Sequence, residues 1–232
     1  SEARRKQDKE RGKRFQAAYA KYEKIAGNRF ATEQIKAQAW RVLCEDWDVA
    51  ANTPPGTPLA YGNGKIIQVK GGEMVSVSDY GFSIDKYEVT NAEYAEFLNA
   101  KGNQTEGGTT WLEADSDYVR IEERGGRFDP KQGYGSHPVI EVSWYGAKAY
   151  CEWAGKRLPT EEEWQQACQG RDGRTYPWGD DFGRGNANVD GKGDGFKRTA
   201  PVGSFSSGAS PYGAMDMSGN VWEWTSPLYE SG

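Results

Sequence analysis

The chain has 232 residues, of which 36% are hydrophobic and 27% are charged, a composition typical of a globular protein. No apolar run is long enough to cross a bilayer, which excludes a membrane-spanning helix. Glycine (30 residues), tyrosine (13) and tryptophan (9) are frequent, which favours a loop-rich fold whose interior is filled by aromatic rings.

The formal net charge of −5 is unevenly distributed. Residues 1–29 hold ten Lys or Arg and four Asp or Glu, a balance of +6, so the rest of the chain carries −11. A basic segment can bind nucleic acid or an anionic membrane, but acidic residues alternate with the bases here, which favours a solvated helix face. The net negative charge of residues 30–232 argues against a nucleic-acid-binding groove in that part of the chain. No apolar leader is visible near the first residue, which favours a cytoplasmic protein.

Three cysteines and one histidine limit the metal and redox chemistry. Cys44, Cys151 and Cys168 show no CxxC spacing and are too few for a disulfide scaffold. The single histidine, His137, excludes a Cys₂His₂ zinc site and any centre that needs several histidines. We expect buried free thiols at the three cysteines, and a structural hydrogen bond rather than catalysis at His137.

Residues 1–50 are predicted to form two helices, each with an apolar stripe at helical spacing. The stripes consist of Phe15, Tyr19, Tyr22 and Ala26 in the first helix and Ile35, Ala39, Trp40, Leu43 and Trp47 in the second. Prolines between residues 54 and 58 predict a linker over residues 51–64. Because an uncovered stripe of this size would promote aggregation, we expect the hairpin to cap the body or to dock a neighbouring domain or subunit.

Short β-strands are predicted at the start of the body, which spans residues 65–232. These strands cover residues 66–70, 74–77 and 82–89. Thr90 and Glu93 then form a capping box, which predicts a helix with one buried face. The polar, Gly-rich stretch that follows predicts a hairpin around residues 118–121.

Two further helices are predicted after a strand over residues 137–142. Ser143 is the expected N-cap of the first helix, which ends at Gly155. Thr160 opens the second helix with another capping box, and Gly170 closes it. Beyond this point the sequence indicates loops.

Seven short motifs follow one another in the body. They are DKYEVTN at residues 85–91, HPV at 137–139, VSW at 142–144, YCEWAGKRLPTE at 150–161, YPWG at 176–179, TAPVG at 199–203 and MSGNVWEWT at 217–225. In this order they resemble the formylglycine-generating (sulfatase-modifying) enzyme family. The resemblance implies an α+β, C-type-lectin-like fold that is loop-rich, and it does not cover the N-terminal helical hairpin.

The resemblance also implies chemistry for which this sequence lacks the residues. In catalytic relatives, two cysteines near the C-terminal end of the domain bind copper(I) and activate oxygen, and these would lie beyond residue 232. Three scattered cysteines do not supply such a pair of soft ligands. We therefore expect the domain to be incomplete at its C-terminus and to contain no catalytic residue, and we expect copper only if the full-length protein supplies the pair.

The loop from residue 186 to residue 197 is the first candidate metal site. Oxygen-bearing residues alternate from Asn186 and Gly191 follows, as in an EF-hand, but Lys197 stands where that motif needs glutamate. Spacing alone therefore favours a turn-rich loop without metal. The resemblance implies calcium instead, bound by two side chains and two carbonyl groups. These ligands are Asn188 and Asp194 through their side chains and Val189 and Phe196 through their carbonyls.

The segment from residue 220 to residue 223 is the second candidate metal site. The resemblance implies a calcium ion held by Asn220, Val221 and Glu223. The alternative is a buried turn without metal, flanked by Trp222 and Trp224. A glutamate buried between two tryptophans is costly without a partner, which favours the ion.

Two functions remain compatible with the sequence. The first is a non-catalytic binding or scaffold module of this family, supported by structural calcium, whose partner is a protein, a peptide or a glycan. The alternative is a fragment of a copper- and O₂-dependent oxidase that converts a substrate cysteine to formylglycine. A fold alone does not determine which of these two functions a protein has. The absence of the copper-binding cysteine pair from this sequence favours the binding module.

Overall fold

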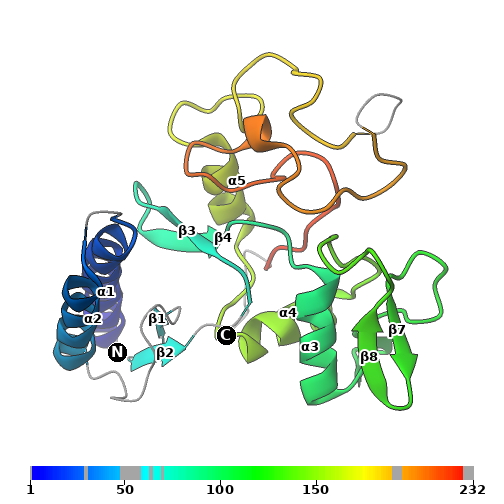
Figure 1. Cartoon of the computed structure of the whole chain (residues 1–232), viewed down its shortest axis with the longest axis horizontal. Coiled ribbons are helices and arrows are strands. Elements are labelled where there is room, and N and C mark those ends of the chain that lie inside the picture. Colours follow the sequence, from blue (N-terminus) through cyan, green and yellow to red (C-terminus); the bar gives the residue numbers. More distant parts are fainter. Residues whose placement is uncertain are drawn as a thin grey trace. The chain divides into compact units, whose positions relative to one another are not determined.

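The computed structural model describes residues 2–28, 31–47, 59–62, 65–68, 71–189 and 195–226. The chain divides into two compact units, residues 1–70 and residues 71–232, which we describe separately (Figure 1). The sequence predicted the body from residue 65, whereas this division lies between Lys70 and Gly71. No helix in the described ranges is both long and apolar enough to span a bilayer.

Unit 1 (residues 1–70) contains the two predicted helices, α1 (Glu2–Ala26) and α2 (Glu33–Trp47), which lie side by side in Figure 1. Their buried cluster consists of Phe15 and Tyr22 from α1 and Trp40 and Leu43 from α2. The rings of Tyr22 and Trp40 are 4.8 Å apart between centroids. The two apolar stripes therefore pack against each other. That the hairpin caps the body or docks a neighbouring domain or subunit stays a prediction.

Two details of unit 1 differ from the sequence-based expectation. Ile35 was expected on the apolar stripe but is 52% exposed, because at 3.6 residues per turn it lies about 140° around the helix axis from Trp40. Part of the predicted linker is a strand, β1 (Leu59–Gly62), which pairs antiparallel with β2 (Lys65–Gln68). The Pro-rich part of the linker lies outside the described residues.

In its described residues, unit 2 (residues 71–232) combines small sheets with three α-helices and long loops, the mixed α+β architecture that the sequence predicted. Each described sheet has two antiparallel strands. The strands are β3 (Met74–Val77) with β4 (Phe82–Asp85), β5 (Thr105–Glu106) with β6 (Thr109–Thr110), and β7 (Ile121–Arg124) with β8 (Arg127–Pro130). The helices are α3 (Asn91–Lys101), α4 (Trp144–Trp153) and α5 (Glu161–Gln169), and one 3₁₀ turn, η1 (Ser206–Gly208), lies in the C-terminal loops.

The three predicted N-caps of these helices are confirmed. Thr90 and Thr160 each begin a complete capping box, and the Ser143 side chain accepts a hydrogen bond from the Gly146 amide. Each such cap contributes about 1 kcal/mol by satisfying an N–H group that the helix leaves unpaired. Arg157 adds a bidentate ion pair with Glu163, with both N–O distances at 2.6 Å, which joins the turn before α5 to its first turn.

Three predicted β elements are corrected by the structure. Residues 137–142 form only isolated bridges, Pro138 with Thr90 and Val142 with Leu112, because Glu141 has φ 61° and breaks the extended backbone. The hairpin expected around residues 118–121 lies further along the chain, as β7 and β8. The predicted strand over residues 82–89 ends earlier, at the end of β4.

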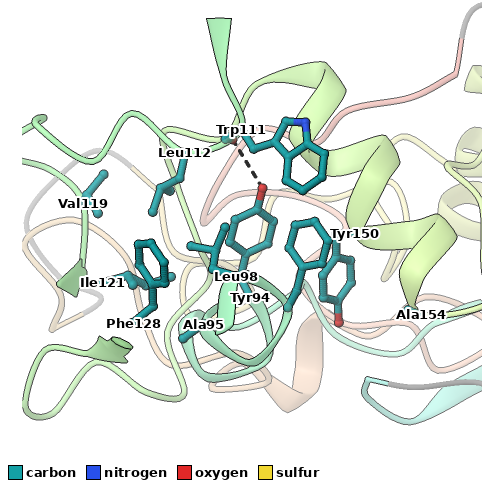
Figure 2. Close-up of a cluster of buried hydrophobic side chains, with 11 residues drawn as sticks. Tyr94, Ala95, Leu98, Trp111, Leu112, Val119, Ile121, Phe128, Tyr150 and Ala154 are labelled. Atoms are coloured by element: carbon teal, nitrogen blue, oxygen red, sulfur yellow. Dashed lines mark hydrogen bonds between the residues drawn. The ribbon is translucent and has the colours of Figure 1, made fainter. Parts of the chain in front are cut away.

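The main core of unit 2 lies between α3, α4 and the loop before β7, and Figure 2 shows its side chains. Tyr94 and Phe97 of α3 pack against Tyr150 of α4, and the Tyr94 hydroxyl donates to the Trp111 carbonyl at 3.3 Å. Gly146 lets α4 approach closely, since a Cβ there would lie 2.4 Å from the Trp111 oxygen. Burial of each large ring contributes roughly 1.5–3 kcal/mol, so this cluster anchors the loops around it.

Candidate functional site

The two candidate metal loops meet in the folded unit. The Asn188 side chain is 6% exposed and its amide nitrogen donates to the Asn220 side-chain oxygen at 2.9 Å. The backbone of the two residues is also joined, from the Asn220 amide to the Asn188 carbonyl at 2.8 Å. Val189 is exposed and Phe196 is half-buried, while Asp194 lies outside the described residues.

The Asn220 amide group is fully hydrogen-bonded. Its oxygen accepts the side-chain N–H of Asn188 and the backbone N–H of Ala200 at 2.8 Å, and its nitrogen donates to Glu88 at 2.6 Å and to the Ala200 carbonyl at 3.3 Å. A backbone N–H can only donate, so the Asn220 side-chain atom next to the Ala200 N–H must be the oxygen. This fixes the orientation of the Asn220 side-chain amide. We call Glu88, Asn188, Asn220 and the backbone groups that they bind the Asn220 network.

This arrangement fits calcium differently at the two predicted sites. Both N–H donors of Asn188 are used, one by the Arg198 carbonyl at 2.6 Å, so its amide oxygen is the side-chain atom left for a cation. The Asn220 oxygen already accepts two N–H groups, so it would have to break these bonds to bind an ion. Within the described ranges, no three His, Cys, Asp or Glu side chains are grouped to hold a metal. Both calcium sites stay predictions.

Three carboxyl groups belong to the Asn220 network or lie near it, and the pKa of each is raised. Burial raises the pKa of Glu88 to about 9, and repulsion from Glu223 and Asp216 adds to this effect. Burial also raises the pKa of Asp216, which accepts the Gly203 amide at 2.6 Å. Close packing of protein atoms raises the pKa of the Glu223 carboxyl to about 7, although part of the side chain reaches solvent.

The surroundings of Glu223 are more open than the sequence indicated. Trp222 is fully exposed and Trp224 is half exposed, so the alternative of a buried turn between them is not found. The Glu223 carboxylate accepts the indole N–H of Trp164 at 3.1 Å, and the Trp224 indole donates to the Val142 carbonyl. Glu223 therefore has a protein partner within the structure.

The cysteines are free thiols, as the sequence predicted. Cys168 is buried, and Cys44 and Cys151 are half-buried. Burial raises the pKa of Cys151 to about 12 and that of Cys168 to about 11. Both thiols are therefore protonated at neutral pH.

A cavity of about 400 Å³ lies beside the Asn220 network. One wall comes from the segment between α3 and α4, with Tyr118, Arg120 and Tyr134, and the other from residues 195–199. The described lining contains three cationic side chains and no carboxylate, and we call it the cationic cavity. Its cations are Arg120, Lys197 and Arg198.

Aromatic rings hold two of these cations. The Arg198 guanidinium lies 4.2 Å from the centre of the Tyr118 ring, and the Arg120 guanidinium lies 4.9 Å from the centre of the Tyr134 ring. In the part of the chain that the structure describes, no ion pair involves either arginine or Lys197. Cation–π contacts hold the face of a guanidinium and leave its in-plane N–H groups available.

His137 also lines the cavity and makes a structural hydrogen bond of the kind that the sequence predicted. Its Nδ1 shares a hydrogen bond of 2.9 Å with the Thr199 hydroxyl, which joins the two walls. Its pKa is lowered by desolvation, with a smaller contribution from the positive charge of Arg120. The Asn91 side-chain nitrogen donates to the carbonyls of Tyr134, His137 and Pro138. These bonds hold the cavity wall that comes from the segment between α3 and α4.

Sequence reasoning missed several of these residues. Glu88 stands inside the DKYEVTN motif, where a lone glutamate in an otherwise strand-like run was an available signal of a buried partner. Tyr118 and Arg120 fall in a stretch with no clear periodicity, and no spacing connects them to Arg198. Only the folded chain brings these segments together.

Comparison with known proteins gives one family. The model of the Sulfatase-modifying factor enzyme 1-like domain matches residues 50–232. The chain is 38% identical over 183 residues to the formylglycine-generating enzyme of Mus musculus, covering 63% of this chain and 49% of the relative. It is 36% identical over 194 residues to the inactive C-alpha-formylglycine-generating enzyme 2 of Bos taurus, covering 69% and 64%.

A third relative is the serine/threonine-protein kinase pkn1 of Chlamydia caviae, which is 39% identical over 152 residues, covering 65% of this chain and 23% of the kinase. The chain thus spans between 23% and 64% of the length of these three relatives. The family model covers well over half of the chain, and the seven motifs lie inside the matched residues. This chain therefore belongs to the FGE-sulfatase family, as a protein with a Sulfatase-modifying factor enzyme 1-like domain.

Proposed function

We propose that the FGE-sulfatase domain of this chain is a calcium-supported, non-catalytic binding module for a protein or glycan ligand. The observation that carries the proposal is the lining of the cationic cavity. Arginine, lysine and tyrosine side chains bind ligands through charge and ring contacts, whereas the described lining offers no thiol and no carboxylate for chemistry. A family relative that is named inactive is consistent with a binding role for the domain.

In this proposal the C-type-lectin-like fold that the resemblance implies serves as a scaffold. The Asn220 network holds the backbone of residues 198–200, and the side chains of Lys197, Arg198 and Thr199 face the cavity from the same segment. Calcium, bound through the side chains of Asn188 and Asp194 and the carbonyls of Val189 and Phe196 as the resemblance implies, would fix the backbone next to this segment. A rigid loop loses less conformational freedom when a ligand binds.

An array of immobilised glycans and peptides tests the binding role. We expect the full chain to bind a defined subset of probes and Arg198→Glu to lose most of that signal, because the change inserts a carboxylate among cations. Arg184→Glu is the matched control, since Arg184 is exposed and does not line the cavity. Equal binding by both variants would show that the ligand site lies elsewhere.

The second candidate function is oxidation of a substrate cysteine to formylglycine. The identity of 38% to a protein named formylglycine-generating enzyme favours it. The positions of the cysteines argue against it, because Cys44, Cys151 and Cys168 lie on three different helices without CxxC spacing and do not supply a pair of soft ligands. Incubation with copper(I), oxygen and a Cys-x-Pro-x-Arg peptide should leave the peptide mass unchanged, and a mass loss that corresponds to the aldehyde would replace the binding proposal.

A partner for unit 1 is also part of the proposal. With the stripes covering each other, the exposed apolar side chains left on α2 include Ile35 and Val42, seven positions apart and on one helix face. We expect Ile35→Lys with Val42→Lys to change the oligomeric state or partner binding without lowering the melting temperature. Light scattering measures the first and calorimetry the second, and an unchanged mass in all conditions would argue against attachment through this face.

A further inference from the structure

We propose that the cationic cavity binds the oxyanion of a phosphate or sulfate ester that is carried on a ring. The proposal rests on the proposed binding function and names the chemistry of its ligand. It requires three properties of the site: a positive field, donors in place for an oxyanion, and room beside them for a ring.

The positive field comes from Arg120, Lys197 and Arg198, which line one cavity without a described carboxylate. Like charges held together raise the free energy of the folded state unless an anion compensates them. The lowered pKa of His137, to which Arg120 contributes, is consistent with that field. The cluster is unusual for its unit, because residues 71–232 carry 15 Lys or Arg and 26 Asp or Glu, a net charge of −11.

The donors are held in place by the rings of Tyr118 and Tyr134. A guanidinium has five N–H donors in a rigid plane, a geometry that suits two oxygens of a phosphate or sulfate group. Arg120 uses one donor for the Asp117 carbonyl at 3.1 Å, which steadies it and leaves others available. The cation–π contacts with Tyr118 and Tyr134 therefore position both guanidinium groups while donors remain available.

The room for a ring follows from size and lining. Cavities of roughly 300–1,000 Å³ are typical of sites for small organic ligands, so 400 Å³ exceeds the needs of a bare anion. Phe196 and Ile140 add apolar surface beside the tyrosines. The negative charge of the surrounding chain disfavours a long polyanion, so a single ester on an aromatic or sugar ring fits better than nucleic acid.

Titration calorimetry on the full chain tests the proposal with five probes: phenyl phosphate, phenyl sulfate, inorganic phosphate, inorganic sulfate and neutral phenyl glucoside. We expect at least one phenyl ester to bind more tightly than its inorganic anion and than phenyl glucoside. Arg198→Gln should weaken that binding about tenfold or more, as expected for a lost charge-assisted hydrogen bond, and Arg184→Gln less than about twofold. The tighter of the two esters identifies the oxyanion.

Each of the other possible outcomes would contradict a different part of the proposal. Inorganic anions that bind as tightly as the phenyl esters would remove the ring from the proposal. Tighter binding of phenyl glucoside, unaffected by Arg198→Gln, would overturn the oxyanion proposal and would indicate that the glucoside binds outside the cavity. No heat with any probe, or equal losses in both variants, would overturn the oxyanion site, and the glycan and peptide array then decides the proposed function separately.

Discussion

The Asn220 network and the cationic cavity share one segment, residues 195–200. They differ in whether the polar groups of this segment have partners within the protein. On the network side, the backbone of Arg198 and Ala200 binds Asn188 and Asn220, and each amide donor there has a partner. On the cavity side, charged side chains of the same segment have no described carboxylate partner. Satisfied polar groups stabilise a fold, whereas cations left without a counter-charge remain available to a ligand.

The largest effect is expected from Asn220→Ala. The change removes four hydrogen bonds. Ala200 loses the partners of its N–H and its carbonyl, the Glu88 carboxyl keeps only the Val221 N–H, and the Asn188 amide nitrogen keeps only the Arg198 carbonyl. We therefore expect a loss of about 3–4 kcal/mol in the free energy of unfolding. Urea unfolding followed by tryptophan fluorescence measures it. Asn99→Ala is the control, because Asn99 makes only two bonds, both to Phe128, and should cost about 1 kcal/mol. Equal losses in the two variants would contradict a central role for the network.

The next effect is a pH dependence of stability that comes from Glu88. Its pKa is about 9 in the folded state, against an ordinary value of 4.5, so between these values the folded state holds a proton that the unfolded state releases. Stability is therefore full below about pH 4.5 and falls as pH rises towards 9, by about 1.4 kcal/mol per pH unit at most.

Unfolding between about pH 5 and pH 8 in the presence of a chelator checks this dependence. Glu88→Gln should flatten the profile, because glutamine does not titrate and its oxygen can still accept the shorter of the two hydrogen bonds, from Asn220. The raised pKa of Glu223, about 7, should leave a smaller slope of the same sign in this variant. A profile that rises with pH would show that Glu88 is ionised in the folded protein.

Calcium should have an intermediate effect. At a free concentration about a hundred times the dissociation constant, a ligand of the folded state adds about 2.7 kcal/mol, or roughly 5–10 °C in melting temperature for a unit of this size. The melting temperature should fall in chelator and recover with calcium. Asn188→Ala should lose this response and Asn99→Ala should keep it. Identical melting curves, with no metal found by elemental analysis, would remove calcium from the proposal.

The smallest effect on stability is expected at the cavity. Arg198→Gln should change the free energy of unfolding by less than about 0.5 kcal/mol, because the side chain is exposed and the described residues give it only the contact with Tyr118 as a strong interaction. The same variant should lose ligand binding. A loss above about 1.5 kcal/mol, larger than that of a typical substitution, would make Arg198 a structural residue.

Features that depend on neighbours along the chain could be predicted from the sequence. The capping boxes of Thr90 and Thr160 need only a glutamate three residues later, and they are found as predicted. Helical spacing located α4 and α5 for the same reason. The order of the seven motifs also identified the family, because it records short segments that each keep their own local form.

The remaining features depend on the folded chain, because the functional groups come from segments that are distant in sequence. Glu88 reaches Asn220 across 132 positions, and His137 reaches Thr199 across 62. Loops have no periodicity that could reveal such contacts, and their paths depend on which buried polar groups find partners. The residue types around Arg198 were visible from the start, but only folding placed three cations and two tyrosines around one cavity.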